Sequence, residues 1–171
     1  MKPTLLNSCA RAASAAEARY RIDVPIAPSR GTRVVALDQG AEPVVRHVAG
    51  LEWARARFFT CPPTTPPANG NGEVAADVTL RSVVDGATSR LSAELTGADV
   101  AVMVATANDG AEIAAAIGDA CTLRAIMTAA LVIADGHDTD AAVAALRPYA
   151  RVLMVTHDEH DVSEVLTALR A

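Results

Sequence analysis

Several familiar signatures of ligand binding are missing from this sequence of 171 residues. Its only lysine is Lys2, which excludes a lysine-bearing phosphate loop. The cysteines, Cys9, Cys61 and Cys121, have neither metal-ligand spacing nor the even number of a disulfide framework, and they indicate a reduced, cytoplasmic setting. The chain has no uninterrupted apolar run of about 18 residues, so we expect no membrane span.

Aromatic residues and positive charge are also scarce. Only 3% of the residues are aromatic whereas 51% are hydrophobic, so the core must be packed by small aliphatic side chains. The formal net charge of −5 argues against a general nucleic-acid binder, because such proteins need a basic face. A small anionic ligand held by backbone amides is still compatible with this charge.

A strand–helix–strand unit is predicted in the middle of the chain. The apolar run 101–106 is typical of a strand buried on both faces, and 125–133 is a second such run. Between them, the segment 108–110 breaks the first run, and Asp109 with Glu112 has the spacing of a helix capping box. Such βαβ units in one sheet are parallel and right-handed.

The flanking segments extend this alternation. Strands are expected at 32–38, 55–60 and 151–156. Helices are expected from Glu42–Pro43 to Gly50, over 78–95, from a cap at Asp138 or Thr139 to Pro148, and from an Asp161/Glu164 capping box to the C-terminus. The 78–95 helix depends on the spacing of its apolar residues, and a short strand at 78–80 is the alternative.

The predicted fold is a three-layer α/β/α, Rossmann-like, doubly wound and mostly parallel sheet. We expect residues 31–171 to form this domain and residues 1–30 to form an N-terminal arm with a possible helix at 8–21. The segment 61–72, CPPTTPPANGNG, predicts a long loop because its prolines and glycines oppose regular structure.

Ligands of such sheets lie at the carboxyl ends of the strands, where the strand order reverses. The expected reversal lies between the strands that end near Asp38 and Thr106. Both following loops lead into helix N-termini, whose free amides favour anions. This predicts a site for a nucleotide or other small anion at Asp38, Gln39, Gly40, Ala41, Thr106, Asn108, Asp109 and Gly110.

A structural role for the same residues is the alternative. The dinucleotide-binding fingerprint needs three glycines, but this chain has Asp38, Gly40 and Pro43 at those places. An aspartate at the first place would repel a phosphate. Thr106, Asn108 and Asp109 could also serve only as turn and cap residues.

The phrase GADVAVMVATANDGAEIAAAIGDACTLRAIMTAALVI, and the order of the elements around it, resemble the N-terminal half of tubulin-like bacterial cell-division GTPases. The resemblance covers residues 33–133. It implies a nucleotide-binding fold in which DQGA and ATANDG stand where the family has its glycine loops. Of the family's loop glycines, Gly40 and Gly110 are retained.

Two enzymatic alternatives arise from other strand-end residues. A divalent metal could be bound by a group of acidic and histidine residues after two neighbouring strands, namely Asp135, His137, Asp138, Asp140, His157, Asp158, Glu159, His160 and Asp161. Each of these is equally suited to a helix cap or a solvated turn. Cys61 could act as a nucleophile with His137 or His157 as its base, or it could simply be a small apolar residue.

The leading functional hypothesis is a non-enzymatic module that binds a small anionic ligand or a protein partner, and formation of a homo-oligomer is part of this hypothesis. No cofactor is identified, and neither nucleic acid nor a membrane is expected as a partner. The alternatives are a degenerate tubulin-like nucleotide-binding protein and a metal- or cysteine-dependent enzyme.

Overall fold

A computed structural model describes residues 30–62, 77–136 and 138–171 of the chain. The predicted arm, apart from Arg30, lies outside these residues, as do the helix at 8–21 and most of the loop at 61–72.

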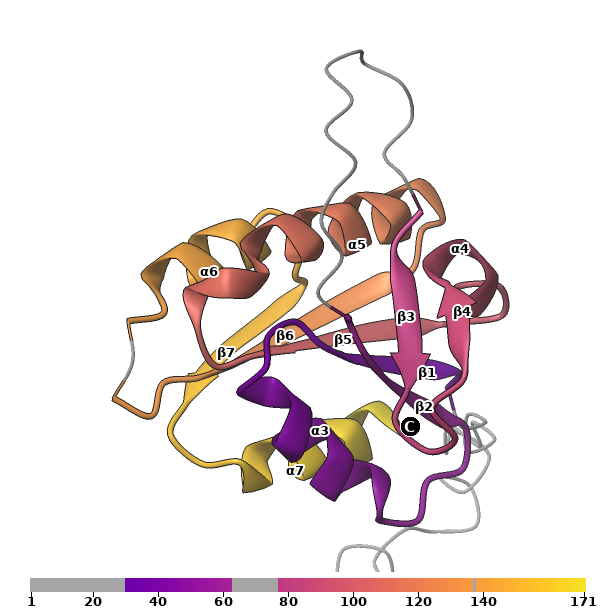
Figure 1. The fold of residues 1–171 in the computed structure, drawn as a ribbon, viewed down its shortest axis with the longest axis horizontal. Coiled ribbons are helices and arrows are strands. Elements are labelled where there is room, and N and C mark those ends of the chain that lie inside the picture. Colours follow the sequence, from indigo (N-terminus) through magenta and orange to yellow (C-terminus); the bar gives the residue numbers. More distant parts are fainter. Residues whose placement is uncertain (1–29, 63–76, 137) are drawn as a thin grey trace, which may run out of the picture.

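The described chain forms a seven-stranded sheet in the order β4-β3-β2-β1-β5-β6-β7 (Figure 1). Strands β2, β1, β5, β6 and β7 run parallel, whereas β3 and β4 form an antiparallel hairpin at one edge. The strands are β1 (Thr32–Ala36), β2 (Ala56–Thr60), β3 (Thr79–Ser82), β4 (Thr88–Arg90), β5 (Val100–Ala105), β6 (Met127–Ile133) and β7 (Val152–Thr156).

Helices cover both faces of this sheet and complete three layers (Figure 1). Helices α3 (Ala41–Ala49) and α7 (His160–Leu169) pack on one face. The other face carries α4 (Leu91–Glu94), α5 (Ala111–Leu123) and α6 (Asp140–Leu146), and the 3-10 turn η1 (Asn108–Gly110) precedes α5. The predicted three-layer, mostly parallel α/β architecture is therefore confirmed.

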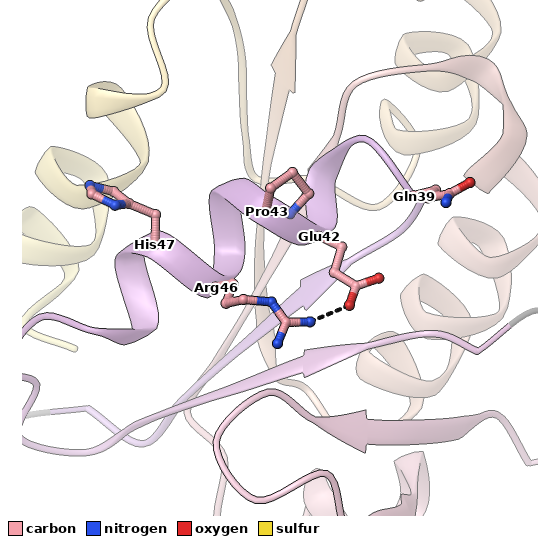
Figure 2. Close-up of a pocket in the computed structure, with 5 residues that line it drawn as sticks. All are labelled: Gln39, Glu42, Pro43, Arg46 and His47. Carbon is pink, nitrogen blue, oxygen red and sulfur yellow. Dashed lines mark hydrogen bonds and ion pairs between the residues drawn. The ribbon is translucent and has the colours of Figure 1, made fainter.

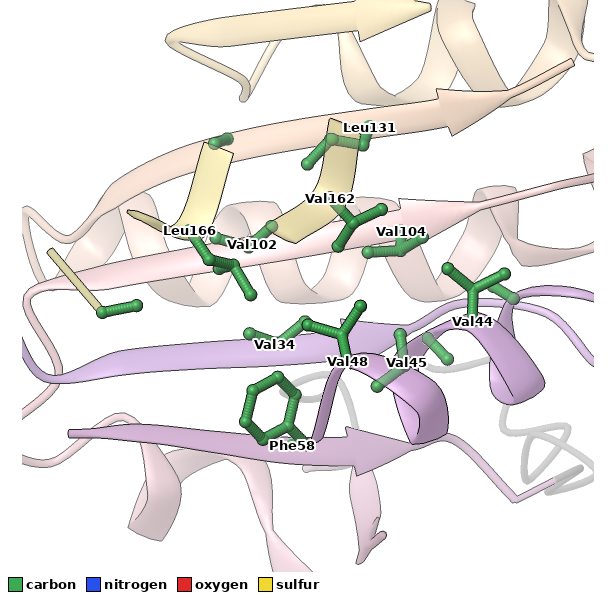
Figure 3. Close-up of a cluster of buried hydrophobic side chains, with 14 of the residues drawn as sticks. Val34, Val44, Val45, Val48, Phe58, Val102, Val104, Leu131, Val162 and Leu166 are labelled. Atoms are coloured by element: carbon green, nitrogen blue, oxygen red, sulfur yellow. The ribbon is translucent and has the colours of Figure 1, made fainter. Parts of the chain in front are cut away.

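Small aliphatic side chains fill the core, as the composition predicts. Figure 3 shows the cluster beneath α3 and α7, where valines from β1 and β5 meet valines of α3. Every residue of β5 is buried because alternate side chains enter the two opposite layers. Phe58 and Phe59 of β2 are divided between the two layers in the same way.

The predicted helix over 78–95 is wrong, because the segment forms the β3–β4 hairpin and only the short helix α4. Its apolar spacing matches a helix, but Gly86 has φ of +70°, a left-handed conformation that suits a tight turn. The turn is closed by hydrogen bonds from Gly86 N to Ser82 O and from Ser82 N to Ala87 O. The Asp85–Gly86 pair is a hairpin signal that the helical interpretation overlooked. The alternative of a strand near 78–80 was the better one.

The predicted capping boxes at α5 and α7 are also wrong. Neither helix has a side-chain cap hydrogen bond at its assigned N-cap residue. Asp109 is the exposed residue of the η1 turn, and Asp161 instead accepts a hydrogen bond from the Thr156 hydroxyl. Before α6, Asp138 accepts a hydrogen bond from Asp140 N, so one of the two suggested residues does contribute to that turn.

Within the described residues, every helix is too short or too polar to cross a membrane.

Candidate functional site

The two loops predicted to meet at the carboxyl edge of the sheet are in contact. Strand β1 lies between β2 and β5, so the chain reverses its direction of strand addition between β1 and β5. Asp38, just beyond β1, reaches Thr106 and Ala107, just beyond β5. This edge is the place where ligands bind in doubly wound sheets.

The Asp38 carboxylate accepts four hydrogen bonds at this edge. Its Oδ1 accepts from Ala41 N at 2.8 Å and from the Thr106 hydroxyl at 2.6 Å. Its Oδ2 accepts from Thr106 N at 2.7 Å and from Ala107 N at 3.1 Å. One side chain therefore joins β1, the first turn of α3 and the loop after β5.

These four bonds use the full acceptor capacity of a carboxylate, which has about four lone-pair sites. The backbone donors come from the start of α3 and from the loop after β5, where an anion would otherwise find free N–H groups. The negative charge of Asp38 thus occupies the position that a small bound anion would take. Electrostatic repulsion and the use of these three backbone amides by Asp38 both oppose a phosphate there.

The glycines of the two loops leave space for atoms of the neighbouring segment. A Cβ atom on Gly40 would lie 2.1 Å from Thr106 Oγ1, and one on Gly110 would lie 2.6 Å from Leu37 Cβ and 2.9 Å from Leu37 O. Both glycines have negative φ, so they are not needed for a left-handed conformation. Their role in this structure is the close approach of the two loops.

The other predicted ligand residues differ in their exposure and in their hydrogen bonds. Asn108 Oδ1 accepts a hydrogen bond from Ala142 N at 3.0 Å and so ties the loop after β5 to α6. Gln39 and Asp109 are exposed, and Ala41 is buried as the first residue of α3. The predicted residues are therefore neighbours, but most of their polar groups are used within the protein.

A shallow hollow of about 460 Å³ lies beside this edge, on the outer side of α3 (Figure 2). It is lined by Gln39, Glu42, Pro43, Arg46 and His47. The Arg46 guanidinium points to the Glu42 carboxylate, one helical turn away, and forms an ion pair with it. The hollow is wide open and its main cation is already paired, which are poor conditions for holding a small anion.

The acidic and histidine residues after β6 and β7 do not form a metal site among the described residues, where no group of three potential ligands comes together. The Asp158 carboxylate accepts a hydrogen bond from His160 N, and Asp138 and Asp161 are used as described above. His137 lies outside the described residues. The described acidic residues after β6 and β7 therefore agree with the alternative interpretation, in which they serve as turn and cap residues.

Cys61 and His157 do not form a nucleophile–base pair. Cys61 follows β2 and His157 follows β7, with β1, β5 and β6 between them. Four inter-strand spacings of about 4.8 Å separate the two residues by roughly 19 Å. Burial raises the pKa of the Cys61 thiol to about 12, which removes its nucleophilic form at neutral pH. Cys121 is fully buried in α5, in agreement with a core role.

We expect Cys61 to be alkylated much more slowly than an unfolded thiol. With a pKa of about 12 instead of 9.0, its thiolate fraction at pH 8 falls by a factor of about 1,000. Peptide mass spectrometry after a timed iodoacetamide pulse measures this site separately from the other cysteines. A short peptide containing Cys61 is the control, and equal rates in the peptide and the folded protein would contradict a half-buried thiol that stays protonated.

An ion cluster that sequence reasoning missed lies at the opposite, amino edge of the sheet. Glu94 of α4 is buried, with Arg57 Nη1 at 2.6 Å and Arg33 Nε at 3.8 Å from its Oε2. Arg33 Nε also donates a hydrogen bond to Glu94 O. Burial, together with the Arg57 charge, lowers the pKa of Arg33, and the Glu94 charge opposes this shift. No sequence motif joins these residues, since folding brings them together from three different elements.

The comparisons with known proteins add no assignment: no protein-family model matches the chain, and no curated protein matches it.

Proposed function

We propose that this protein is a non-enzymatic interaction module of the cytoplasm, built on a Rossmann-like fold whose ligand edge is closed by its own aspartate. The observation that supports this most strongly is the fourfold hydrogen bonding of the Asp38 carboxylate. A group with no remaining acceptor capacity cannot bind a substrate or metal without first breaking its own bonds. The acidic chain also makes nucleic acid an unfavourable partner.

Binding of a small anion is the second candidate; the size and the basic side chains of the hollow on α3 support it, whereas the open shape and the paired Arg46 oppose it. Its volume of about 460 Å³ falls within the range of small-molecule sites, and its lining includes Arg46 and His47. Under the tubulin-like hypothesis of descent, Asp38 would have replaced the phosphate of an ancestral nucleotide. The anion-binding candidate predicts that a nucleotide or phosphate binds, whereas the leading proposal and the replacement of the phosphate by Asp38 predict that it does not.

Thermal unfolding in the presence of nucleotides distinguishes these proposals. We expect ATP, GTP and inorganic phosphate to leave the midpoint of unfolding unchanged, because a ligand stabilises the native state by RT ln(1 + [L]/Kd) only if it binds. A rise with one nucleotide that is absent in an Arg46→Ala/His47→Ala variant would favour ligand binding at the hollow. Turnover of that nucleotide would overturn the non-enzymatic proposal.

A further inference from the structure

The two edges of the sheet differ in a way that indicates an interaction surface. At one end, β4 is only three residues long and polar, with the sequence Thr88–Ser89–Arg90. At the other end, β7 has five residues with the sequence VLMVT and pairs only with β6 among the described strands. Short, polar edge strands discourage pairing, whereas longer apolar edge strands are templates for it.

Both faces of β7 are apolar and incompletely covered. Val152 is 51% exposed and Val155 is 52% exposed. Met154 contacts the core cluster beneath α7, and Leu153 contacts the cluster beneath α6. Because side chains alternate along a strand, one exposed valine lies on each face of the edge. Figure 1 shows β7 as the outermost strand on this side of the sheet.

The charges at the two ends of β7 are opposite. Arg151 is exposed immediately before the strand, and Asp158 and Glu159 are exposed just after it. None of these three forms an ion pair with another described residue. A second β7 laid antiparallel beside the first would place the basic start of each strand against the acidic end of the other.

We propose that β7 is the binding site for a second copy of this chain, whose own β7 joins it antiparallel and continues the sheet. A two-fold axis at Val155 brings Arg151, just before β7 of one copy, near the acidic turn with Asp158 and Glu159 that follows β7 of the other. The two exposed Val155 side chains then lie opposite each other on one face of the new strand pair. A second copy is the partner that fits best, because the same chain carries both the basic residue before β7 and the acidic residues after it. Each copy therefore supplies one charge of each opposite-charge contact. The inference rests on the proposed interaction role and names the partner for it.

Light scattering of the full chain over a range of concentrations and salt tests this pairing. We expect the wild-type protein to dimerise, and the dissociation constant to rise with salt because the end charges are screened. Val155→Glu is expected to raise the dissociation constant at least about tenfold, since it puts a charge at the centre of the pairing. Val84→Glu is the matched control, because Val84 is 79% exposed at the hairpin end of the sheet and should leave the dimer unchanged.

A charge exchange keeps the test independent of any folding defect. Arg151→Glu should weaken the dimer, and adding Glu159→Arg should restore it, because the exchanged charges again face each other. A monomeric wild-type protein, a dimer insensitive to Val155→Glu, or equal effects of the two valine variants would overturn the pairing. The nucleotide titration above tests the interaction role separately, so the two proposals can fail independently.

Discussion

Replacing Asp38 with alanine is expected to lower the free energy of unfolding by about 3 kcal/mol, because three backbone amides and one hydroxyl lose a charged acceptor. Hydrogen bonds to a charged group contribute about 1.5–3 kcal/mol each, but water can reach this half-buried edge and replace part of the loss. Urea denaturation of the variant and the wild-type protein measures the difference.

Two further variants make this prediction specific. In Asp38→Asn the remaining side-chain oxygen can accept hydrogen bonds from two of the four donors, whereas the new NH₂ group faces the other two donors. We therefore expect a free energy of unfolding between those of the wild-type protein and Asp38→Ala. Asp109→Ala removes an exposed carboxylate from the same edge, and we expect a change of less than about 0.5 kcal/mol. Equal losses for Asp38→Ala and Asp109→Ala would show that the four bonds do not stabilise the fold.

Replacing Glu94 with alanine should cost a similar amount, about 3 kcal/mol, because it leaves the Arg33 charge buried without its partner. The Arg33 side chain is only 10% exposed, whereas that of Arg57 is 57% exposed and can turn to solvent. This places the expected cost at the lower end of the range of about 3–5 kcal/mol for a broken buried pair. Thermal unfolding followed by circular dichroism measures the loss.

The exposed ion pair on α3 provides the matched control. Glu42 and Arg46 are one helical turn apart, and both side chains are substantially exposed. Glu42→Ala is therefore expected to cost at most about 0.5 kcal/mol, as for other surface pairs at this spacing. If Glu94→Ala were no more destabilising than Glu42→Ala, the cluster at the amino edge would not hold α4 to the sheet.

The fold could be predicted because its parallel strands are buried on both faces and so appear as continuous apolar runs. The segments 101–106 and 125–133 are the clearest cases, and the structure places β5 and β6 there. The hairpin at 79–90 could not be recognised from apolar spacing, since Val83, Val84 and Ala87 match a helix as well as they match a turn. The local signal that decides the matter is the Asp85–Gly86 turn.

The position of the candidate site was predictable, but the pairing of its polar groups was not. Strand order brings Asp38 and Thr106 to one edge, as the alternation of strands and helices implies. The Asp38 carboxylate accepts hydrogen bonds from amides that are 68 and 69 residues away in the sequence. Such pairs depend on the distances between atoms in the folded chain, which the sequence pattern does not contain. For the same reason, Asp109 and Asp161 were assigned as caps from spacing, although neither forms the predicted cap.

An anion titration tests most directly whether the Asp38 carboxylate fills the position of a bound anion. Wild-type protein and the Asp38→Ala variant are unfolded by heat in increasing concentrations of sodium formate, with sodium chloride at equal ionic strength as the reference. We expect formate to raise the unfolding temperature of the variant, because it replaces the missing carboxylate, and to leave the wild-type protein unchanged. Equal stabilisation of both proteins by formate, or no response in a destabilised variant, would contradict the account.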